Sequence, residues 1–442
     1  MGDSRRVRQY TVPAWMIAEC TAARERGDWR AACAAARVTV GFADAGPVAD
    51  LLAGFAPDLL RRHLPRSRAG SGALIGGARY VLAPDGPVTA DTMVLELRTS
   101  PWTTGSQRLA LDAVRAGALG EGRVVPLPPY LWDARRAEEL RAVTAAADDG
   151  VWTLEAWAAA GWALDRVEES YWSRSGLDLL LRIDPGLAAR ELRRVAGQFG
   201  HRSWPLWRDL GGRDSAIPEW HLRLELADGG PRVTWGRQGP DPTGFCLHPP
   251  LLRPPVDDLV PLASVVPDGF AADEHVRVRC GADWHRIAVR GGRLELLDHT
   301  DDERRREHAL RAFGGEMRDC FRAESAWLGG GAGLPRRLRE YRRDLWRRME
   351  HGGSRVVLAL LDAGLDPHLR DEHGRTLLHR IHQFEHAELL PRLLAAGLDV
   401  NAVNRGGYTP MCEVLAHEAP YDLVLALNEA GAIPRLADGG AP

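Results

Sequence analysis

The chain has 442 residues, of which 45% are hydrophobic, and its formal net charge at neutral pH is -3. This length is enough for two or three domains with ordinary hydrophobic cores. A chain with so little net charge is not a wholesale binder of nucleic acid or of anionic membranes. Any such role would have to be confined to a local patch.

All 57 basic residues are arginine, because the chain contains no lysine. It therefore lacks the phosphate-binding lysine of a P-loop, the Schiff-base lysine of a pyridoxal phosphate enzyme and the strand lysine of a protein kinase. The chain also lacks the catalytic patterns G-x-S-x-G and H-E-x-x-H. The absence of lysine argues against P-loop, pyridoxal phosphate and kinase chemistry, so our expectation leans towards a protein that is not an enzyme and leaves other chemistry undecided.

The six cysteines lack C-x-x-C spacing and do not suggest a disulfide scaffold. They are typical of a protein from a reducing cytosol. The first residues lack the apolar segment of a signal peptide, and no run of about 18 apolar residues follows. We therefore expect a soluble, cytoplasmic protein that does not contact a membrane.

In chain order, residues 1–238 alternate between helical and strand patterns. Helices are predicted at 13–37 with a break at 27–28, and at 50–65, 106–118, 132–148, 153–172 and 185–199. Hairpins with PDGP and DGGP turns are predicted at 78–99 and 220–235. The fold class predicted for this region is α+β, with antiparallel hairpins and helices. The proline-dense segment 239–258 is predicted to be an extended connection.

Residues 259–328 are predicted to form a small module of β-hairpins and one helix. Three strand patterns at 275–280, 284–290 and 293–297 precede a helical pattern at 301–327. The glycine-rich stretch 329–335 is the predicted linker to the last part of the chain.

The stretch 336–349 is a predicted helix with seven arginines against Glu340 and Asp344. An apolar stripe marks the face that should pack on a neighbouring element, and it consists of Leu338, Tyr341, Leu345 and Met349. We interpret the segment as the first helix of a repeat stack with its arginines in water. A nucleic-acid or anion contact is the alternative.

A 33-residue repeat follows this helix. Gly364, Asp366, Gly374 and Thr376 recur as Gly397, Asp399, Gly407 and Thr409. A fixed spacing of this size is typical of stacked repeats. The glycines 364 and 397 are predicted to adopt positive φ and end the second helix of each repeat, and the threonines to cap the first.

These residues resemble the ankyrin family. HGRTLLH and GGYTPMC stand where that family has G-x-T-P-L-H, and LLAAGLDVNAVN stands where it has its second helix, glycine stop and hairpin. The resemblance covers about residues 345–435 and implies a short all-α ankyrin-like stack over 336–436. Leu377 stands in place of the family's proline and Cys412 in place of its histidine. The whole chain is similar to ankyrin-tailed proteins of GC-rich bacteria. This likeness gives no information about an activity.

The resemblance implies an intracellular adaptor that binds a protein partner through its hairpin tips and inner helices. Carried over by motif, the tips are Glu372, His373, Arg375, Arg405, Gly406 and Tyr408, and the inner-helix face contains Arg380, Gln383 and Glu413. About three repeats are needed for an independent array. We therefore expect residues 341–373 to pack against the amino-terminal region.

Two groups of histidines have spacings that could suit metal ligands. His379, His382 and His386 share a helical spacing with Glu385 near them, but the resemblance gives His379 a structural role. Strand alternation turns His275 away from the face of Cys280, and places His285 with Ile287 and Val289 as a core histidine. We expect no metal and no cofactor.

The strands of residues 275–297 also predict a charged face. Arg277, Arg279, Arg286, Arg290 and Arg293 should project with Trp284 from the face opposite the valines. Such a face could bind a phosphate-rich partner. The other interpretation is a face of salt bridges to Glu295, Asp301, Asp302 and Glu303, which we prefer.

One alternative to the adaptor stays open. Residues 1–330 could be an enzyme or a module that handles nucleotides or nucleic acids, with the repeats as a targeting or regulatory appendage. The arginine face and the many tryptophans motivate this hypothesis. Glu168 and Glu169 lie close to Tyr171 and Trp172, but adjacent side chains diverge and cannot both face one substrate.

Overall fold

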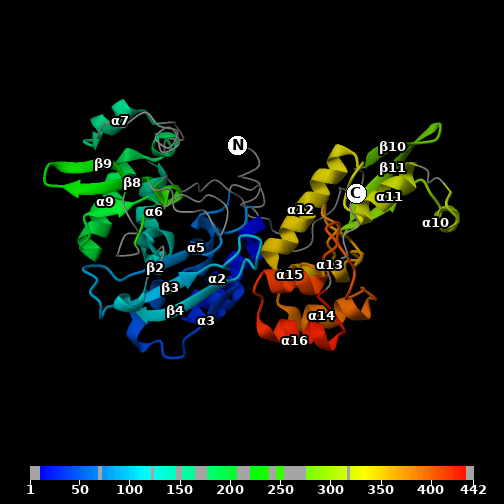
Figure 1. Cartoon of the computed structure of the whole chain (residues 1–442), viewed down its shortest axis with the longest axis horizontal. Coiled ribbons are helices and arrows are strands. Elements are labelled where there is room, and N and C mark those ends of the chain that lie inside the picture. Colours follow the sequence, from blue (N-terminus) through cyan, green and yellow to red (C-terminus); the bar gives the residue numbers. More distant parts are fainter. Residues whose placement is uncertain are drawn as a thin grey trace. The chain divides into compact units, whose positions relative to one another are not determined.

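The computed structural model describes residues 10–67, 72–120, 124–145, 152–164, 177–206, 220–237, 245–252, 275–315 and 319–434 (Figure 1). The chain divides into two compact units, residues 1–261 and residues 262–442. The chain contains both helices and strands, which confirms the predicted mixture of the two kinds of secondary structure. The finer boundaries at residues 238, 258 and 328 stay predictions.

The first unit contains a mixed five-stranded sheet. Its strands are β1 (Val38–Val40), β2 (Arg79–Leu82), β3 (Met93–Arg98), β4 (Leu109–Arg115) and β5 (Val124–Pro126). The strand order is β1-β4-β3-β2-β5, with β2, β3 and β4 antiparallel, β1 parallel to β4 and β5 parallel to β2. The accompanying helices are α2 (Ala14–Glu25), α3 (Trp29–Ala35), α4 (Ala49–Gly54), α5 (Pro57–His63) and α6 (Ala137–Ala145).

The predicted helix at 106–118 is wrong, because these residues form β4 and a short 3-10 helix at Ala116–Ala118. The apolar residues of β4 follow a period of two, and Leu109 and Leu111 are buried. Asp112 pairs with Arg98 on the neighbouring strand β3. Strand β3 buries residues on both of its faces and not on one face only. Glu96 is buried and forms an ion pair with Arg79 at 2.6 Å.

A four-stranded sheet completes the first unit. It contains β6 (Ala163–Leu164), β7 (Ser203–Pro205), β8 (Trp220–Ala227) and β9 (Gly230–Arg237) in the order β6-β9-β8-β7. The antiparallel β8–β9 pair confirms the predicted hairpin. Helix α9 (Pro185–Phe199) is confirmed as well, and its first turn is capped by Asp184, whose side chain accepts from the amide of Leu187 at 2.8 Å.

The helix predicted from residue 153 begins as expected, because Thr153 accepts a hydrogen bond from the amide of Ala156 at 3.2 Å. Helix α7 (Leu154–Ala159) nevertheless stops early, before Gly161 with φ of 84°. Glu168, Glu169 and the aromatic residues beside them lie outside the described residues.

Part of the proline-dense segment belongs to the core of the first unit. Residues 245–252 end in a 3-10 helix, Pro249–Leu252. Phe245 forms an isolated β-bridge with Val124, and Leu247 forms one with Leu206. Cys246 is buried in the same hydrophobic cluster as the five-stranded sheet. These residues therefore pack against the unit and do not only connect it to the next one.

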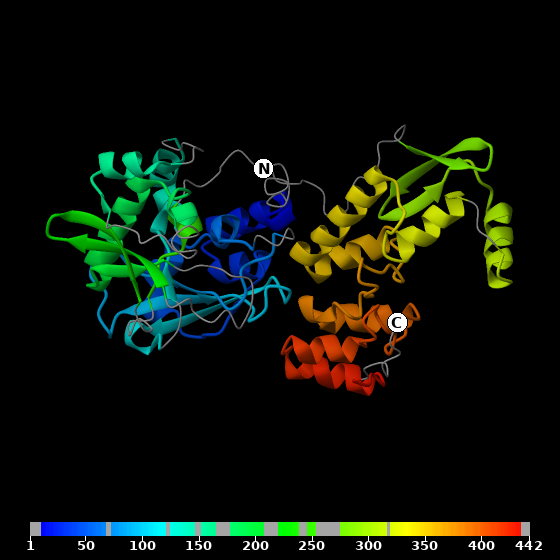
Figure 2. The same cartoon turned by 45° about the horizontal axis from the view of Figure 1, so that its top comes forward.

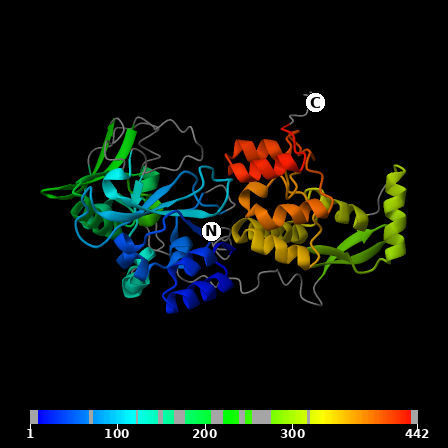
Figure 3. The same ribbon diagram turned by 90° about the horizontal axis from the view of Figure 1, so that it is seen from below.

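The second unit begins with an antiparallel sheet of β10 (Val276–Cys280), β11 (Asp283–Arg290) and β12 (Arg293–Leu296), which confirms the three predicted strands. Two helices follow, α10 (Asp301–Ala312) and α11 (Asp319–Leu328). The single helix predicted at 301–327 is therefore wrong. Gly314, with φ of 82°, follows the end of α10 and stops it. Figure 3 shows α10 at the end of this unit farthest from the helices that follow α11.

The rest of the second unit is helical (Figure 2). It contains α12 (Arg336–Gly352), α13 (Ser354–Asp362), η6 (Ile381–Gln383), α14 (His386–Ala395), α15 (Pro410–Ala416) and α16 (Tyr421–Glu429). The α-helix expected before α14 is wrong. Those residues form turns and a 3-10 helix, because amides 380, 381, 383 and 384 donate to carbonyls three residues earlier. One hydrophobic core extends from Cys280 to Ala432, on both sides of the glycine-rich stretch 329–335.

Helix α12 buries the predicted stripe at Leu338, Leu345 and Met349. The expectation that its arginines lie in water is wrong for Arg342 and Arg347, which are buried. The guanidinium of Arg342 donates to the carbonyl of Trp327 at 2.8 Å and to the carbonyl of Arg370. Burial lowers the pKa of Arg342 to about 10. This arginine ties the last turn of α11 to the chain that follows α13.

Candidate functional site

Two loops in the second unit make the same hydrogen bonds at equivalent positions of the repeat. In the first loop, Asp371 Oδ1 accepts from the amides of His373 at 2.8 Å and Arg375 at 3.0 Å. In the second, Asn404 Oδ1 accepts from the amides of Gly406 at 2.8 Å and Tyr408 at 3.1 Å. A short polar side chain that holds its own turn in this way fixes the loop backbone. Both loops are therefore rigid at their tips.

The glycines that flank these loops have the predicted conformations. Gly364 and Gly397 follow α13 and α14 with φ of 101° and 81°. Thr409 stands at the predicted N-cap position of α15, but its side chain makes no capping hydrogen bond, and Thr376 does not precede an α-helix. Thr376 Oγ1 lies 2.9 Å from His379 Nδ1, and Thr409 Oγ1 donates to the carbonyl of Ile433 at 2.8 Å.

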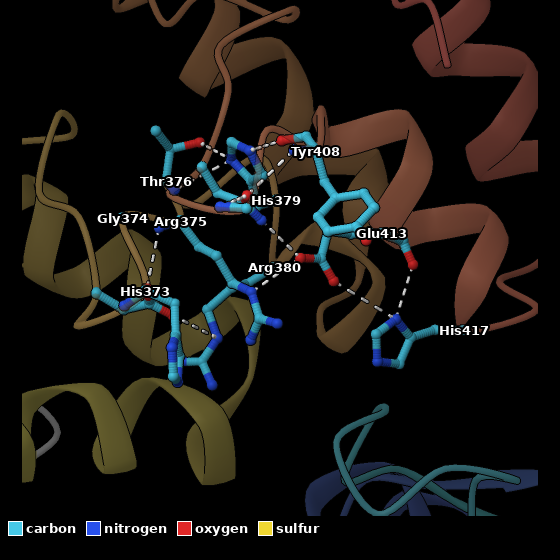
Figure 4. A network of polar contacts seen from close by, with 12 residues as sticks. His373, Gly374, Arg375, Thr376, His379, Arg380, Tyr408, Glu413 and His417 are labelled. Carbon is cyan, nitrogen blue, oxygen red and sulfur yellow. Dashed lines mark hydrogen bonds and ion pairs between the residues drawn. The ribbon is translucent and has the colours of Figure 1, made fainter. Parts of the chain in front are cut away.

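His379 connects the first loop to the second (Figure 4). Its Nδ1 accepts from the amide of Thr376 at 3.1 Å, and its Nε2 lies 3.0 Å from the carbonyl oxygen of Tyr408. A carbonyl only accepts and an amide only donates, so the ring must carry its proton on Nε2. The residue is fully buried, and burial lowers its pKa. His379 is therefore a neutral structural link between repeats.

Glu413 of α15 makes a second link between the loops (Figure 4). Its Oε1 accepts from Arg375 Nε at 2.8 Å and from Asn404 Nδ2 at 3.0 Å. Its backbone carbonyl also contacts His417 Nδ1 at 2.7 Å. A buried carboxylate with several donors is satisfied, so this group belongs to the scaffold.

The predicted tip residues lie where a partner could reach them. Glu372, His373, Arg405 and Gly406 are exposed, and Tyr408 is 45% exposed. These residues project from the two rigid loops. Arg375 is half-buried because it pairs with Glu413, so it belongs partly to the scaffold.

The predicted inner-helix residues do not form an open face. Gln383 and Glu413 are buried. Arg380 lies over the ring of Trp346, with 5.2 Å to the ring centroid, and 3.7 Å from Glu350. Burial raises the pKa of Glu350, which Arg380 and Arg347 oppose. The predicted inner-helix residues therefore contribute to packing and ion pairs inside the helical region.

The chain matches no protein-family model. It is similar to an ankyrin repeat-containing protein of Schizosaccharomyces pombe, with 36% identity over 87 residues. The match covers 19% of this chain and 41% of that protein, so the chain spans about two fifths of the relative's length. The likeness supports an ankyrin-repeat region in this chain. The likeness to bacterial ankyrin-tailed proteins stays a prediction.

The three histidines with a helical spacing do not converge on a metal site. His379 makes the links described above. His382 stacks on His417, with 4.0 Å between ring centroids, and His386 lies 3.8 Å from Asp422. The turn and 3-10 conformation of this segment removes the common helical face that such a site requires.

The predicted arginine face of the small sheet exists. Register pairs Arg277 with Arg286, Arg279 with Trp284 and Arg290 with Arg293, so all six project from one face. All six are exposed.

Two of these arginines have carboxylate partners. Arg286 Nε lies 3.0 Å from Asp298 Oδ1, and this guanidinium lowers the pKa of Asp298 to about 2. Arg290 pairs with Glu295 at 3.1 Å, as expected. The predicted pairing with acidic residues 301–303 is wrong. Asp301 and Asp302 pair with Arg304 and Arg305, and Glu303 forms a capping box with Thr300.

Sequence reasoning missed two kinds of residue. Asp371 and Asn404 hold the two tips, and their signal was a short polar side chain that recurs at the spacing of the repeat. The second kind is His299 and Cys320, which lie beside Cys280 and His285 at the small sheet but stand too far from them in sequence to suggest a shared site. Among the described residues, no helix has both the length and the apolar character needed to cross a membrane.

Proposed function

We propose that this chain is an adaptor that binds a protein partner through ankyrin repeats. Helices α12 to α16 would form the short all-α stack of the repeat region. The recurrence of the loop hydrogen bonds supports this proposal, and so does the likeness to an ankyrin repeat-containing protein. Binding is the role that such repeats serve, because a stacked array presents a continuous surface.

The observation that carries the proposal is a contrast within the two loops. The buried side chains of Asp371 and Asn404 hold the backbones of the two loops. The side chains at the tips of these loops, in contrast, are exposed. We define the tip surface as Glu372, His373, Arg405 and Tyr408. A rigid backbone lowers the entropy lost on binding. Tyrosine and arginine are the side chains that contribute most at protein interfaces.

The test is affinity capture from a native lysate with the full chain as bait. The tip variant carries His373→Ala, Arg405→Ala and Tyr408→Ala. Arg375 is left intact because its loss would also break the contact with Glu413. The matched control carries Arg277→Ala and Trp284→Ala, which remove an exposed arginine and an exposed aromatic ring from the same unit.

We expect partners that bind the wild type and the control variant, and whose recovery with the tip variant falls roughly tenfold, which a loss of about 1.4 kcal/mol would produce. Identical prey with all three proteins would contradict the proposal. Loss with the control variant alone would favour the alternative described next.

The alternative is a site for phosphate-rich ligands on the arginine face. Trp284 is 63% exposed and lies opposite Arg279, with Arg277 on the same face. An exposed ring beside cations can stack a base while the cations contact phosphate. A thermal-shift screen of the full chain with nucleotides and single-stranded nucleic acids tests this role. A shift that the Arg277→Ala and Trp284→Ala variant abolishes would support it, and no shift with any ligand would remove it.

A further inference from the structure

Four side chains in the second unit place metal-ligand atoms close together. Cys280, His285, His299 and Cys320 each offer one sulfur or ring nitrogen, and these four atoms all lie within 4.8 Å of one another. His285 Nδ1 is 2.8 Å from His299 Nε2, and Cys280 Sγ is 3.8 Å from the same nitrogen. Tetrahedral zinc with two sulfur and two nitrogen ligands separates its donors by roughly 3.3–3.8 Å. Small shifts would therefore fit the four donors around one ion.

The fold brings these residues together from four places. Cys280 ends β10, and His285 lies in β11 on the same face, because Val278 pairs with His285. His299 follows β12, and Cys320 is the second residue of α11. The four positions are spread along the sequence without the short spacings that mark many metal sites. The sheet and the helix that packs on it create the cluster.

The two cysteines of the cluster are buried, and its two histidines are half-buried. Cys320 is fully buried, Cys280 is 6% exposed, and the His299 side chain is 4% exposed. The His299 ring packs against Phe321, with 4.7 Å between centroids. All six cysteines are free thiols, so no disulfide joins Cys280 to Cys320. Two buried thiols and the imidazoles of two half-buried histidines that converge in this way are the donors that zinc prefers.

A carboxylate supports the far side of one imidazole. His299 Nδ1 lies 3.6 Å from Glu303 Oε2, while His299 Nε2 faces the cluster. Glu303 is held in place by the capping box, since its Oε2 accepts from the amide of Thr300 at 2.9 Å. Metal-binding histidines usually direct their second ring nitrogen to a carboxylate, which fixes the ring and the tautomer. This arrangement is independent of the convergence of the four donors.

We propose that Cys280, His285, His299 and Cys320 bind one zinc ion. Four protein ligands leave no open position for water or substrate, so the site is structural and not catalytic. The ion joins β10, β11, the loop between β12 and α10, and helix α11. On binding, each thiol loses its proton to solvent and its sulfur forms a bond to the metal.

The first experiment measures metal in the full chain. Wild type and variants are loaded with zinc, desalted and analysed for zinc by mass spectrometry, and a parallel set is loaded with cobalt and examined by visible absorption. The cysteine variants are Cys280→Ser and Cys320→Ser. Cys412→Ser is the matched control, because Cys412 is a half-buried thiol of the same unit outside the cluster.

We expect about one zinc ion per chain for wild type and the control. Wild-type cobalt protein should show intense tetrahedral bands and a thiolate charge-transfer band, and each cysteine variant should bind metal at least roughly tenfold more weakly. Wild type without bound zinc and without these bands overturns the proposal. So does a Cys320→Ser protein that retains as much zinc as wild type, or a Cys280–Cys320 disulfide found in place of metal.

A second variant avoids the risk that cysteine variants do not fold. Glu303→Gln keeps the capping box, because glutamine can serve at that position, but it removes the charge beside His299. We expect its circular dichroism to match wild type and its zinc affinity to fall about tenfold in competition with a chelator. Unchanged affinity in this folded variant would contradict the placement of His299 Nε2 as a ligand.

Discussion

The two 33-residue repeats have the same loop backbone but differ in how each connects to the residues that follow. In the first, His379 bonds at one ring nitrogen to Thr376 and at the other to the carbonyl of Tyr408 in the next loop. In the second, the corresponding residue is Cys412, whose sulfur lies 3.5 Å from the hydroxyl oxygen of Thr409 in its own repeat. Thr409 itself makes an outward bond, to the carbonyl of Ile433.

This difference separates what a repeat needs for its own shape from what it needs to join its neighbour. The Asx contacts of Asp371 and Asn404 are local and recur without change. The histidine link is non-local, and position 412 has a cysteine in place of the second imidazole. A residue that spans two repeats should therefore matter more to the stability of the unit than its equivalent in the last repeat.

The largest effect is expected for His379→Ala. It removes a fully buried ring and leaves the amide of Thr376 and the carbonyl of Tyr408 without this partner. We expect the free energy of unfolding of the second unit to fall by about 3 kcal/mol. Cys412→Ala is the paired variant and should cost less than about 1.5 kcal/mol. Urea denaturation of the full chain measures both, and equal losses would show that the histidine link adds nothing.

The next largest effect on stability is expected for the side chains that hold the two loops, Asn404 and Asp371. Asn404→Ala should cost about 2 kcal/mol, because it removes two acceptor contacts in the loop and the donor to Glu413. Asp371→Ala should cost somewhat less if the two amide contacts dominate. Asp371→Asn keeps the acceptor and gives the first loop the side chain of the second, so its stability should stay close to wild type. Urea denaturation again measures the three variants. A large loss in Asp371→Asn would mean that the charge, and not the turn, holds this loop.

A pH dependence should follow from the same histidine. Burial lowers the pKa of His379 in the folded chain, while Asp371 and Glu413 act to raise it and Arg370 to lower it. The unfolded chain binds a proton near pH 6.5 and the folded chain only at lower pH. The stabilising contribution is therefore present above about pH 6.5 and is lost as the pH falls below it.

Denaturation between about pH 7.5 and pH 5 measures this dependence, and the stability difference between wild type and His379→Ala should shrink towards acid. Other histidines titrate in the same window, so the comparison with the variant is the informative quantity. A difference that is constant across the range would contradict a neutral, buried His379.

Local periodicity was sufficient to predict much of this fold, including the three strands of the small sheet, the β8–β9 hairpin and the glycine stops at 364 and 397. It failed where tertiary contacts outweigh local preference. Residues 109–115 are rich in helix formers, yet they pair with β3 and bury Leu109 and Leu111 in the sheet. The alternation rule placed His285 in the core with Ile287 and Val289 but gave no sign that His299 and Cys320 lie beside it.

Local periodicity could not reveal the cluster of Cys280, His285, His299 and Cys320. Its last two members come from a loop and a helix and not from the strands. His299 and Cys320 stand far beyond Cys280 in sequence. Only the packing of α11 on the sheet brings them beside the strand residues. In the repeat region, the exposed tips were predicted from motif positions, whereas the burial of Gln383 depends on a 3-10 segment that no local pattern indicated.

The smallest effect is expected for the tip surface, and it tests whether scaffold and surface are separable. His373 has a side chain 64% exposed, and Tyr408 is 45% exposed. Replacing them with alanine should change the free energy of unfolding by less than about 0.5 kcal/mol each. If the tip variant unfolds with the wild-type midpoint, any partner that it loses is lost through the surface. A lower midpoint would mean that Tyr408 or Arg405 packs on the neighbouring loop, and single variants would then have to replace the triple one before binding could be assigned to the tips.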